Sequence, residues 1–138
     1  MDKSNIESIV ETFKSQSKNF FKMMYLNEKI NKYFTSFYFI LSKKFIKLQP
    51  IKSMELVVKY THKHYNELMT FNENFYKSLN IAEIFEDSND EDDNYYKIWF
   101  IKIKSVWEGI PQNERTELIR AFQCMVLTSS KYYLMVNS

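Results

Sequence analysis

Two histidines, His62 and His64, are the side chains best suited to exchange protons near neutral pH. They lie two residues apart, which on a helix separates them by roughly 200° around the axis. Side chains so oriented cannot bind one metal ion together or act on one substrate. We therefore expect one histidine at the edge of the core and the other in solvent.

The single cysteine, Cys124, excludes an internal disulfide, and with two histidines it leaves too few ligands for the usual zinc sites. Cys124 falls beside an apolar stripe, and the sequence around it has no feature that activates a thiol. We predict a buried structural thiol. The one glycine, Gly109, excludes the glycine-rich loops that hold dinucleotides or phosphates. The sequence thus predicts no catalytic residue, cofactor or metal site, and no enzyme.

A run of carboxylates is the strongest charge feature of the chain: Glu86, Asp87, Asp90, Glu91, Asp92 and Asp93. Clustered carboxylates attract hard cations such as calcium. Counted as an EF-hand from Asp87, however, the sixth position is Asp92 rather than glycine, and the twelfth is Ile98 rather than glutamate. We expect Glu86 to Asn94 to form an exposed acidic loop, with weak cation binding as the alternative.

Lysines are concentrated toward the N-terminus, since residues 1–65 hold 12 lysines and 5 acids whereas residues 66–138 hold 7 bases and 12 acids. Lysine clusters can bind a nucleic-acid backbone. No arginine precedes Arg115, so the basic half lacks bidentate phosphate and base contacts. We interpret the lysines as solvated and keep nucleic-acid binding as an alternative. The candidate basic patch comprises Lys14, Lys18, Lys22, Lys43, Lys44 and Lys47.

Most aromatic residues recur at helical spacing, which is typical of a core rather than of a base-stacking surface. Four tyrosines fall outside these stripes, and surface tyrosines are common at protein interfaces. The candidate interface residues are Tyr25, Tyr38, Tyr95 and Tyr133.

Apolar residues recur every three or four positions along most of the chain, as on one face of an α-helix. The first such segment reaches Met24 and is interrupted by Ser17. A second runs from Ile30 to Leu48 and stops before Pro50, because proline disfavours helix at the residue preceding it. Pro50 can then begin a third helix, which the pattern extends to Leu68.

A less regular pattern from Phe71 to Ile84 leads into the acidic segment. From Tyr96 to Ile110 the period favours a helix, although the β-branched residues would also suit a strand. We place Gly109 as a C-terminal cap and Pro111 at the start of the last helix, whose apolar stripe ends at Val136. These elements predict an all-α fold, a single-domain antiparallel bundle of five or six helices over residues 1–138 with one acidic loop.

The N-terminal segment does not have the pattern of a secretory signal, and the most apolar window, Tyr33 to Leu41, is too short to span a membrane. We therefore expect no membrane span and no secretion. The second half of the chain resembles a family of small uncharacterised proteins of large AT-rich nucleocytoplasmic DNA viruses. The resemblance covers roughly residues 50–136 and lies in Pro50 onward, Asn72 to Tyr76, Ile98 to Trp107, Ile110–Pro111 and Ile119 to Tyr132.

This resemblance implies a viral product in the host cytoplasm or in the virion, and it transfers no functional residue. Our leading hypothesis is a non-enzymatic interaction protein, a capsid or core accessory component that self-associates or binds a protein partner. One alternative is a nucleic-acid-associated accessory protein that uses the lysines. Another is a Bcl-2-like cell-death modulator, although the expected Gly-Arg motif is absent because Gly109 is followed by Ile110.

Overall fold

The computed structural model describes residues 3–32, 43, 46–70, 73–78 and 91–137. Every regular element in these residues is helical, which confirms the predicted all-α bundle. The α-helices are α1 (Lys3–Leu26), α2 (Glu28–Asn31), α4 (Pro50–Thr61), α5 (Tyr65–Met69), α6 (Glu73–Ser78), α8 (Glu91–Val106) and α9 (Gln112–Val136). Two short 3-10 helices, η1 (His62–His64) and η2 (Trp107–Gly109), join neighbouring elements.

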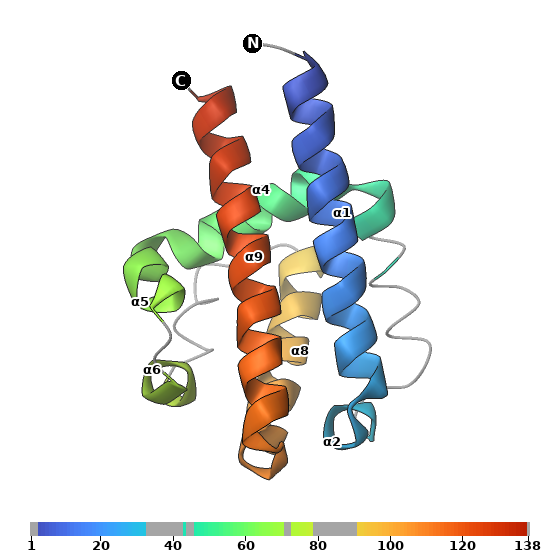
Figure 1. Cartoon of the computed structure of the whole chain (residues 1–138), viewed down its shortest axis with the longest axis vertical. Coiled ribbons are helices and arrows are strands. Elements are labelled where there is room, and N and C mark those ends of the chain that lie inside the picture. The colour runs from blue at the N-terminus through green and yellow to red at the C-terminus, as the bar shows by residue number, and fades with distance from the viewer. Residues whose placement is uncertain (1–2, 33–42, 44–45, 71–72, 79–90, 138) are drawn as a thin grey trace.

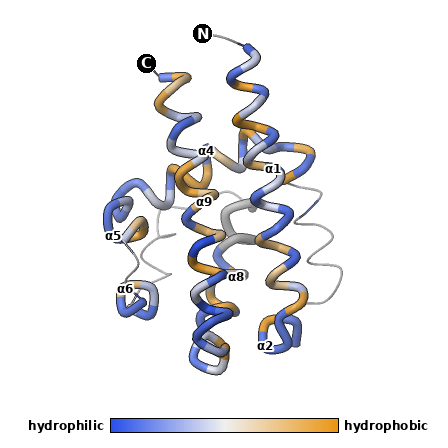
Figure 2. The backbone as a smooth tube through the Cα atoms, in the orientation of Figure 1, coloured by the Kyte–Doolittle hydropathy of each residue, from blue (hydrophilic) through white to orange (hydrophobic). Residues whose placement is uncertain are grey.

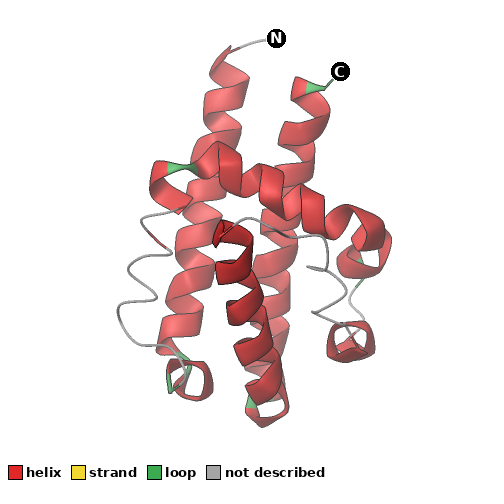
Figure 3. Ribbon diagram, turned by 180° about the vertical axis from the view of Figure 1, so that it is seen from behind, coloured by secondary structure: helices red, strands yellow, loops and turns green. Residues whose placement is uncertain are grey.

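The two longest helices, α1 and α9, run antiparallel and form the axis of the molecule (Figure 1). Helix α4 crosses both of them and packs mainly on α9, as the rear view in Figure 3 shows. Helix α8 lies against the pair on the same side as α4, below it. Beyond α4, the first turns of α1 and the last turns of α9 continue as a pair, so both chain ends lie at one end of the molecule (Figure 1).

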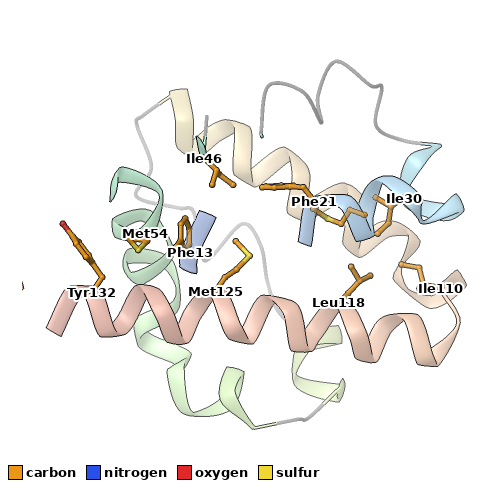
Figure 4. Close-up of a cluster of buried hydrophobic side chains, with 10 residues drawn as sticks. Phe13, Phe21, Ile30, Ile46, Met54, Ile110, Leu118, Met125 and Tyr132 are labelled. Atoms are coloured by element: carbon orange, nitrogen blue, oxygen red, sulfur yellow. The ribbon is translucent and has the colours of Figure 1, made fainter. Parts of the chain in front are cut away.

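The core lies where side chains from α1, α2, α4 and α9 converge (Figure 4). On α1, the buried residues Phe13, Phe21 and Met24 share one face with Ser17. Ser17 is not an interruption of that face, because it is only 1% exposed and its hydroxyl donates a 2.8 Å hydrogen bond to the carbonyl of Phe13. This bond within the helix satisfies the hydroxyl and allows a small polar side chain to lie in the core.

Prolines mark the two helix starts that the sequence predicts. Pro50 is the first residue of α4, and Pro111 caps α9 with a carbonyl that accepts hydrogen bonds from the amides of Glu114 and Arg115. The third helix, however, is divided. Helix α4 ends at Thr61, η1 follows, and α5 carries the chain to Met69, so the predicted continuous helix to Leu68 is wrong.

The first two predicted helices separate at Asn27, which caps α2. Its side-chain oxygen accepts hydrogen bonds from the amides of Lys29 and Ile30 at 3.0 and 3.2 Å. The segment predicted as a helix from Ile30 to Leu48 is helical at 30–31, 43 and 46–48, and its other residues, apart from the turn residue Lys32, lie outside the described part of the chain. Within the predicted segment 71–84, the structure describes residues 73–78, and these form α6.

Helix α8 confirms the helical prediction for residues 98–106 and corrects the prediction of the acidic loop. Glu91 to Asn94 form the first turn of α8 rather than a loop, while residues 86–90 lie outside the described residues. Carboxylates at a helix N-terminus interact favourably with the helix dipole, which offsets their mutual repulsion. Gly109 ends η2 without a positive φ, so it does not provide the left-handed cap that glycine usually supplies.

Candidate interaction surface

The two histidines lie apart, as expected, but on a 3-10 turn. His62 is exposed, and its Nδ1 lies 3.0 Å from the carbonyl oxygen of Lys59. His64 is partly buried, with its ring 5.6 Å from the ring of Phe75. The two imidazoles therefore have separate surroundings at the junction of α4 and α5.

Cys124 is exposed, so the prediction of a buried thiol is wrong. The buried side of α9 is centred on Met125, Ser129 and Tyr132. Cys124 precedes Met125 by one residue, or about 100° around the helix. That rotation is enough to turn the thiol from the core to the solvent.

The acidic residues do not make a described metal site. Glu86, Asp87 and Asp90 lie outside the described residues, and only the backbone of Glu91, Asp92 and Asp93 is described. Within the part of the chain that the structure describes, no group of three or more His, Cys, Asp or Glu side chains is placed to hold a metal ion. In the same residues, no helix is both long and apolar enough to cross a membrane.

The described members of the candidate basic patch lie on α1 and just before α4. Lys18 and Lys22 are exposed and one turn apart, and Lys43 and Lys47 are also exposed. Lys14 differs from them, because its ammonium group lies 3.2 Å from the carboxylate of Glu11. Lys44 is outside the described residues.

The candidate tyrosines do not form one patch in the described structure. Tyr25 and Tyr133 are 42% and 47% exposed, as predicted. Tyr25 lies near the end of α1 and Tyr133 near the end of α9, and because these helices are antiparallel the two tyrosines lie at opposite ends of the pair. Tyr38 lies outside the described residues, and only the backbone of Tyr95 is described.

A cluster of apolar side chains surrounds the paired ends of α1 and α9, and we call it the end surface. On α9, Tyr133, Leu134 and Val136 are 47%, 67% and 40% exposed. On α1, three partly buried residues near the start of the helix pack against the core. Figure 2 shows that the start of α1 and the end of α9 lie at the same end of the molecule. The end surface comprises Ile6, Ile9, Val10, Tyr133, Leu134 and Val136.

The sequence pattern predicts the apolar residues of this surface, but it does not predict that they are exposed. Val136 follows Tyr132 by four residues and continues the stripe of buried residues on α9, but Tyr132 is 8% exposed and Val136 is 40% exposed. The stripe thus extends past the point where α4 and α8 cover it. Helical periodicity identifies the apolar face, but it does not show where the covering elements end.

Polar contacts fix α5 and α6 to α9. The guanidinium of Arg115 donates to the carboxylate of Glu73 on α6 and, at 2.9 Å, to the carbonyl of Ile110. The amide of Gln123 and the hydroxyl of Tyr76 both donate to the carbonyl of Leu68, at 2.8 and 2.5 Å. Burial raises the pKa of the Tyr76 phenol, and its hydrogen bond with Gln123 partly opposes that rise.

Comparison of the chain with protein-family models, curated proteins and solved structures found no match.

Proposed function

We propose that this protein is a helical interaction protein that binds a protein partner through the end surface, and that it acts without chemistry of its own. The observation that carries the proposal is the exposure of Tyr133 and Val136, two apolar side chains three residues apart and therefore on the same side of α9. Contiguous exposed apolar side chains mark interaction sites on proteins that otherwise remain in solution. Tyrosine among them supplies contact area together with a polar group.

The rigidity of α9 supports this proposal. The end surface continues a helix that is anchored in the core by Leu118, Met125 and Tyr132. The backbone of such a helix is already ordered before a partner binds, so no backbone ordering opposes binding. The viral origin, and a place in the virion as a capsid or core accessory component, remain parts of the proposal that rest on the sequence resemblance.

Chemical cross-linking in cells tests the interaction directly. We compare the wild-type chain with the variant Tyr133→Ser/Leu134→Ser/Val136→Ser, and use Ile98→Ser/Ile101→Ser as the control. The control removes two apolar side chains of similar exposure, 44% and 46%, from α8. The proposal predicts that cross-links to protein, whether to another copy or to a different chain, are lost in the first variant and kept in the second.

The proposed function would be contradicted if both variants gave the same cross-links, or if the wild-type chain gave no protein cross-links. Mass spectrometry of purified virions tests the viral part, and the proposal predicts that the protein is packaged.

The nucleic-acid alternative has one specific observation in its favour, the exposed pair Lys18 and Lys22 on α1. Lysine contacts to phosphates give binding that weakens steeply with salt. Oligonucleotide binding measured over a salt series, with Lys18→Gln/Lys22→Gln as the variant, tests this alternative. Tight binding with a steep salt slope that the variant reduces would favour it over the protein-binding proposal.

A further inference from the structure

Helix α6 is attached to the fold without a buried side chain of its own. It has six residues, Glu73–Ser78, and none of the six is buried. It lies at the edge of the molecule, next to α5 (Figure 1). An isolated helix of this length is unstable in water, because its few hydrogen bonds do not offset the cost of nucleation. The helical form of α6 therefore depends on its contacts with other elements.

Two ion pairs join α6 to the start of α9 and to η2. The carboxylate of Glu73 accepts a hydrogen bond from the guanidinium of Arg115, and these side chains are 22% and 14% exposed. One turn later, the ammonium of Lys77 lies 3.6 Å from the carboxylate of Glu108, with side chains 36% and 75% exposed. One pair is thus largely shielded from solvent and the other is open to it.

A second set of contacts joins α6 to η1 and α5. The ring of Phe75 lies 5.6 Å from the ring of His64, and the hydroxyl of Tyr76 donates to the carbonyl of Leu68 at 2.5 Å. The side chain of Gln123 on α9 donates to the same carbonyl at 2.8 Å. This carbonyl therefore keeps a partner when Tyr76 moves away, which lowers the cost of detaching α6.

The main core cluster does not involve α6. Among the residues that the structure describes, its buried members come from α1, α2, α4 and α9, together with Ile46 and Ile110. Segments with few buried apolar contacts open locally at free energies well below that of global unfolding. Salt screens exposed ion pairs, and it has far less effect on apolar packing at moderate concentration. The attachment of α6 should therefore depend on salt more strongly than the core does.

We propose that α6 is a strap that detaches from α5 and α9 and unfolds while the rest of the fold stays intact, and that ionic strength controls its opening. Opening takes the carboxylate of Glu73 away from Arg115 and exposes a guanidinium that is 14% exposed in the closed state. The strap thus controls access to this cation. It is separate from the end surface, so it does not depend on the proposed function.

Hydrogen exchange measured by mass spectrometry on the full chain tests the strap. The wild type is compared between about 50 mM and about 500 mM sodium chloride, a range over which the Debye length falls roughly threefold. The protected amides of residues 73–78 should exchange about threefold faster or more at the higher concentration. The amides in the middle of α1 and α9 should keep their rates.

Charge exchange at the outer ion pair gives the sharper arm of the experiment. Lys77→Glu places two carboxylates together and should speed exchange in α6 about fivefold, after correction for the intrinsic rate of each sequence. The double variant Lys77→Glu/Glu108→Lys brings opposite charges together again and should return exchange in α6 to nearly the wild-type rate. Lys14→Glu is the matched control, because Lys14 and Glu11 form an ion pair within α1 with side chains 34% and 72% exposed. It should leave exchange in α6 unchanged.

Urea separates opening of the strap from unfolding of the whole chain. Opening six residues exposes little surface, so low concentrations of urea should change exchange in α6 only slightly, while exchange in the middle of α1 and α9 should accelerate steeply. Four results would overturn the inference: no protection of α6 at low salt, exchange in α6 that does not respond to salt, a urea dependence in α6 equal to that in α1, or a double variant that exchanges as fast as Lys77→Glu.

Discussion

Two side-chain donors share the carbonyl of Leu68, and we predict that removing both destabilises the fold by more than the sum of the single removals. Tyr76 and Gln123 donate to this oxygen at 2.5 and 2.8 Å. Leu68 is 4% exposed and lies in the last turn of α5, where carbonyls lack partners within the helix. Either donor alone satisfies the oxygen, so each single loss is small.

The expected magnitudes follow from that geometry. Tyr76→Phe and Gln123→Met each remove one hydrogen bond and should lower the free energy of unfolding by about 1 kcal/mol. The double variant removes both donors from a carbonyl oxygen in a buried residue, which adds about 1 to 3 kcal/mol beyond the sum. For a chain of this size, each kcal/mol lowers the melting temperature by about 4 °C.

Urea denaturation followed by circular dichroism measures all three variants. Ser105→Ala serves as the control, because its hydroxyl donates to the carbonyl of Lys102 at 2.7 Å in an exposed position. We expect the control to lose less than about 0.5 kcal/mol. If the double variant were simply additive, the carbonyl of Leu68 would have another partner and the reasoning would be refuted.

Phe13→Ala should lower the free energy of unfolding by about 3 to 5 kcal/mol, because Phe13 is 0% exposed in the core; a change below about 1 kcal/mol in urea denaturation would show that α1 does not pack as described. Because burial raises the pKa of Tyr76 above its ordinary value of 10.0, the folded state holds the phenol proton more tightly than the unfolded state does. The stability that this proton contributes should be complete below pH 10 and be lost as the pH rises through the raised pKa. The difference in free energy of unfolding between wild type and Tyr76→Phe should therefore shrink in urea titrations at alkaline pH. A difference that stays constant with pH would contradict this. Because Cys124 is exposed, it should react with a thiol reagent in the native protein, and absorbance follows the reaction. Reaction only after unfolding would show instead that the thiol is buried.

The parts of the fold that follow from the sequence are those set by local chemistry. Pro50 and Pro111 lack an amide hydrogen and have a fixed φ, so they mark helix starts wherever the chain continues at helical spacing. The period of three and four over residues 98–106 outweighs the preference of their β-branched residues for strands. Both features act within a few residues and are visible in the sequence.

The remaining differences depend on tertiary packing. The apolar spacing continues through Thr61 and Leu68, and nothing in it shows that η1 redirects the chain between them. Cys124 lies one position from the buried stripe, and periodicity locates a face only to within about that rotation. The exposure of Val136 is set by where α4 and α8 end, which a pattern along α9 alone does not contain.

The central claim is that the exposed apolar side chains at the end of α9 bind a protein partner. Photo-cross-linking in cells, with a photoreactive amino acid placed at Tyr133 and, as the control, at Ile98 on α8, tests that claim most directly. The account predicts strong cross-links to protein from position 133 and weaker ones from position 98. Cross-links of equal yield from both positions, or none from position 133, would contradict it.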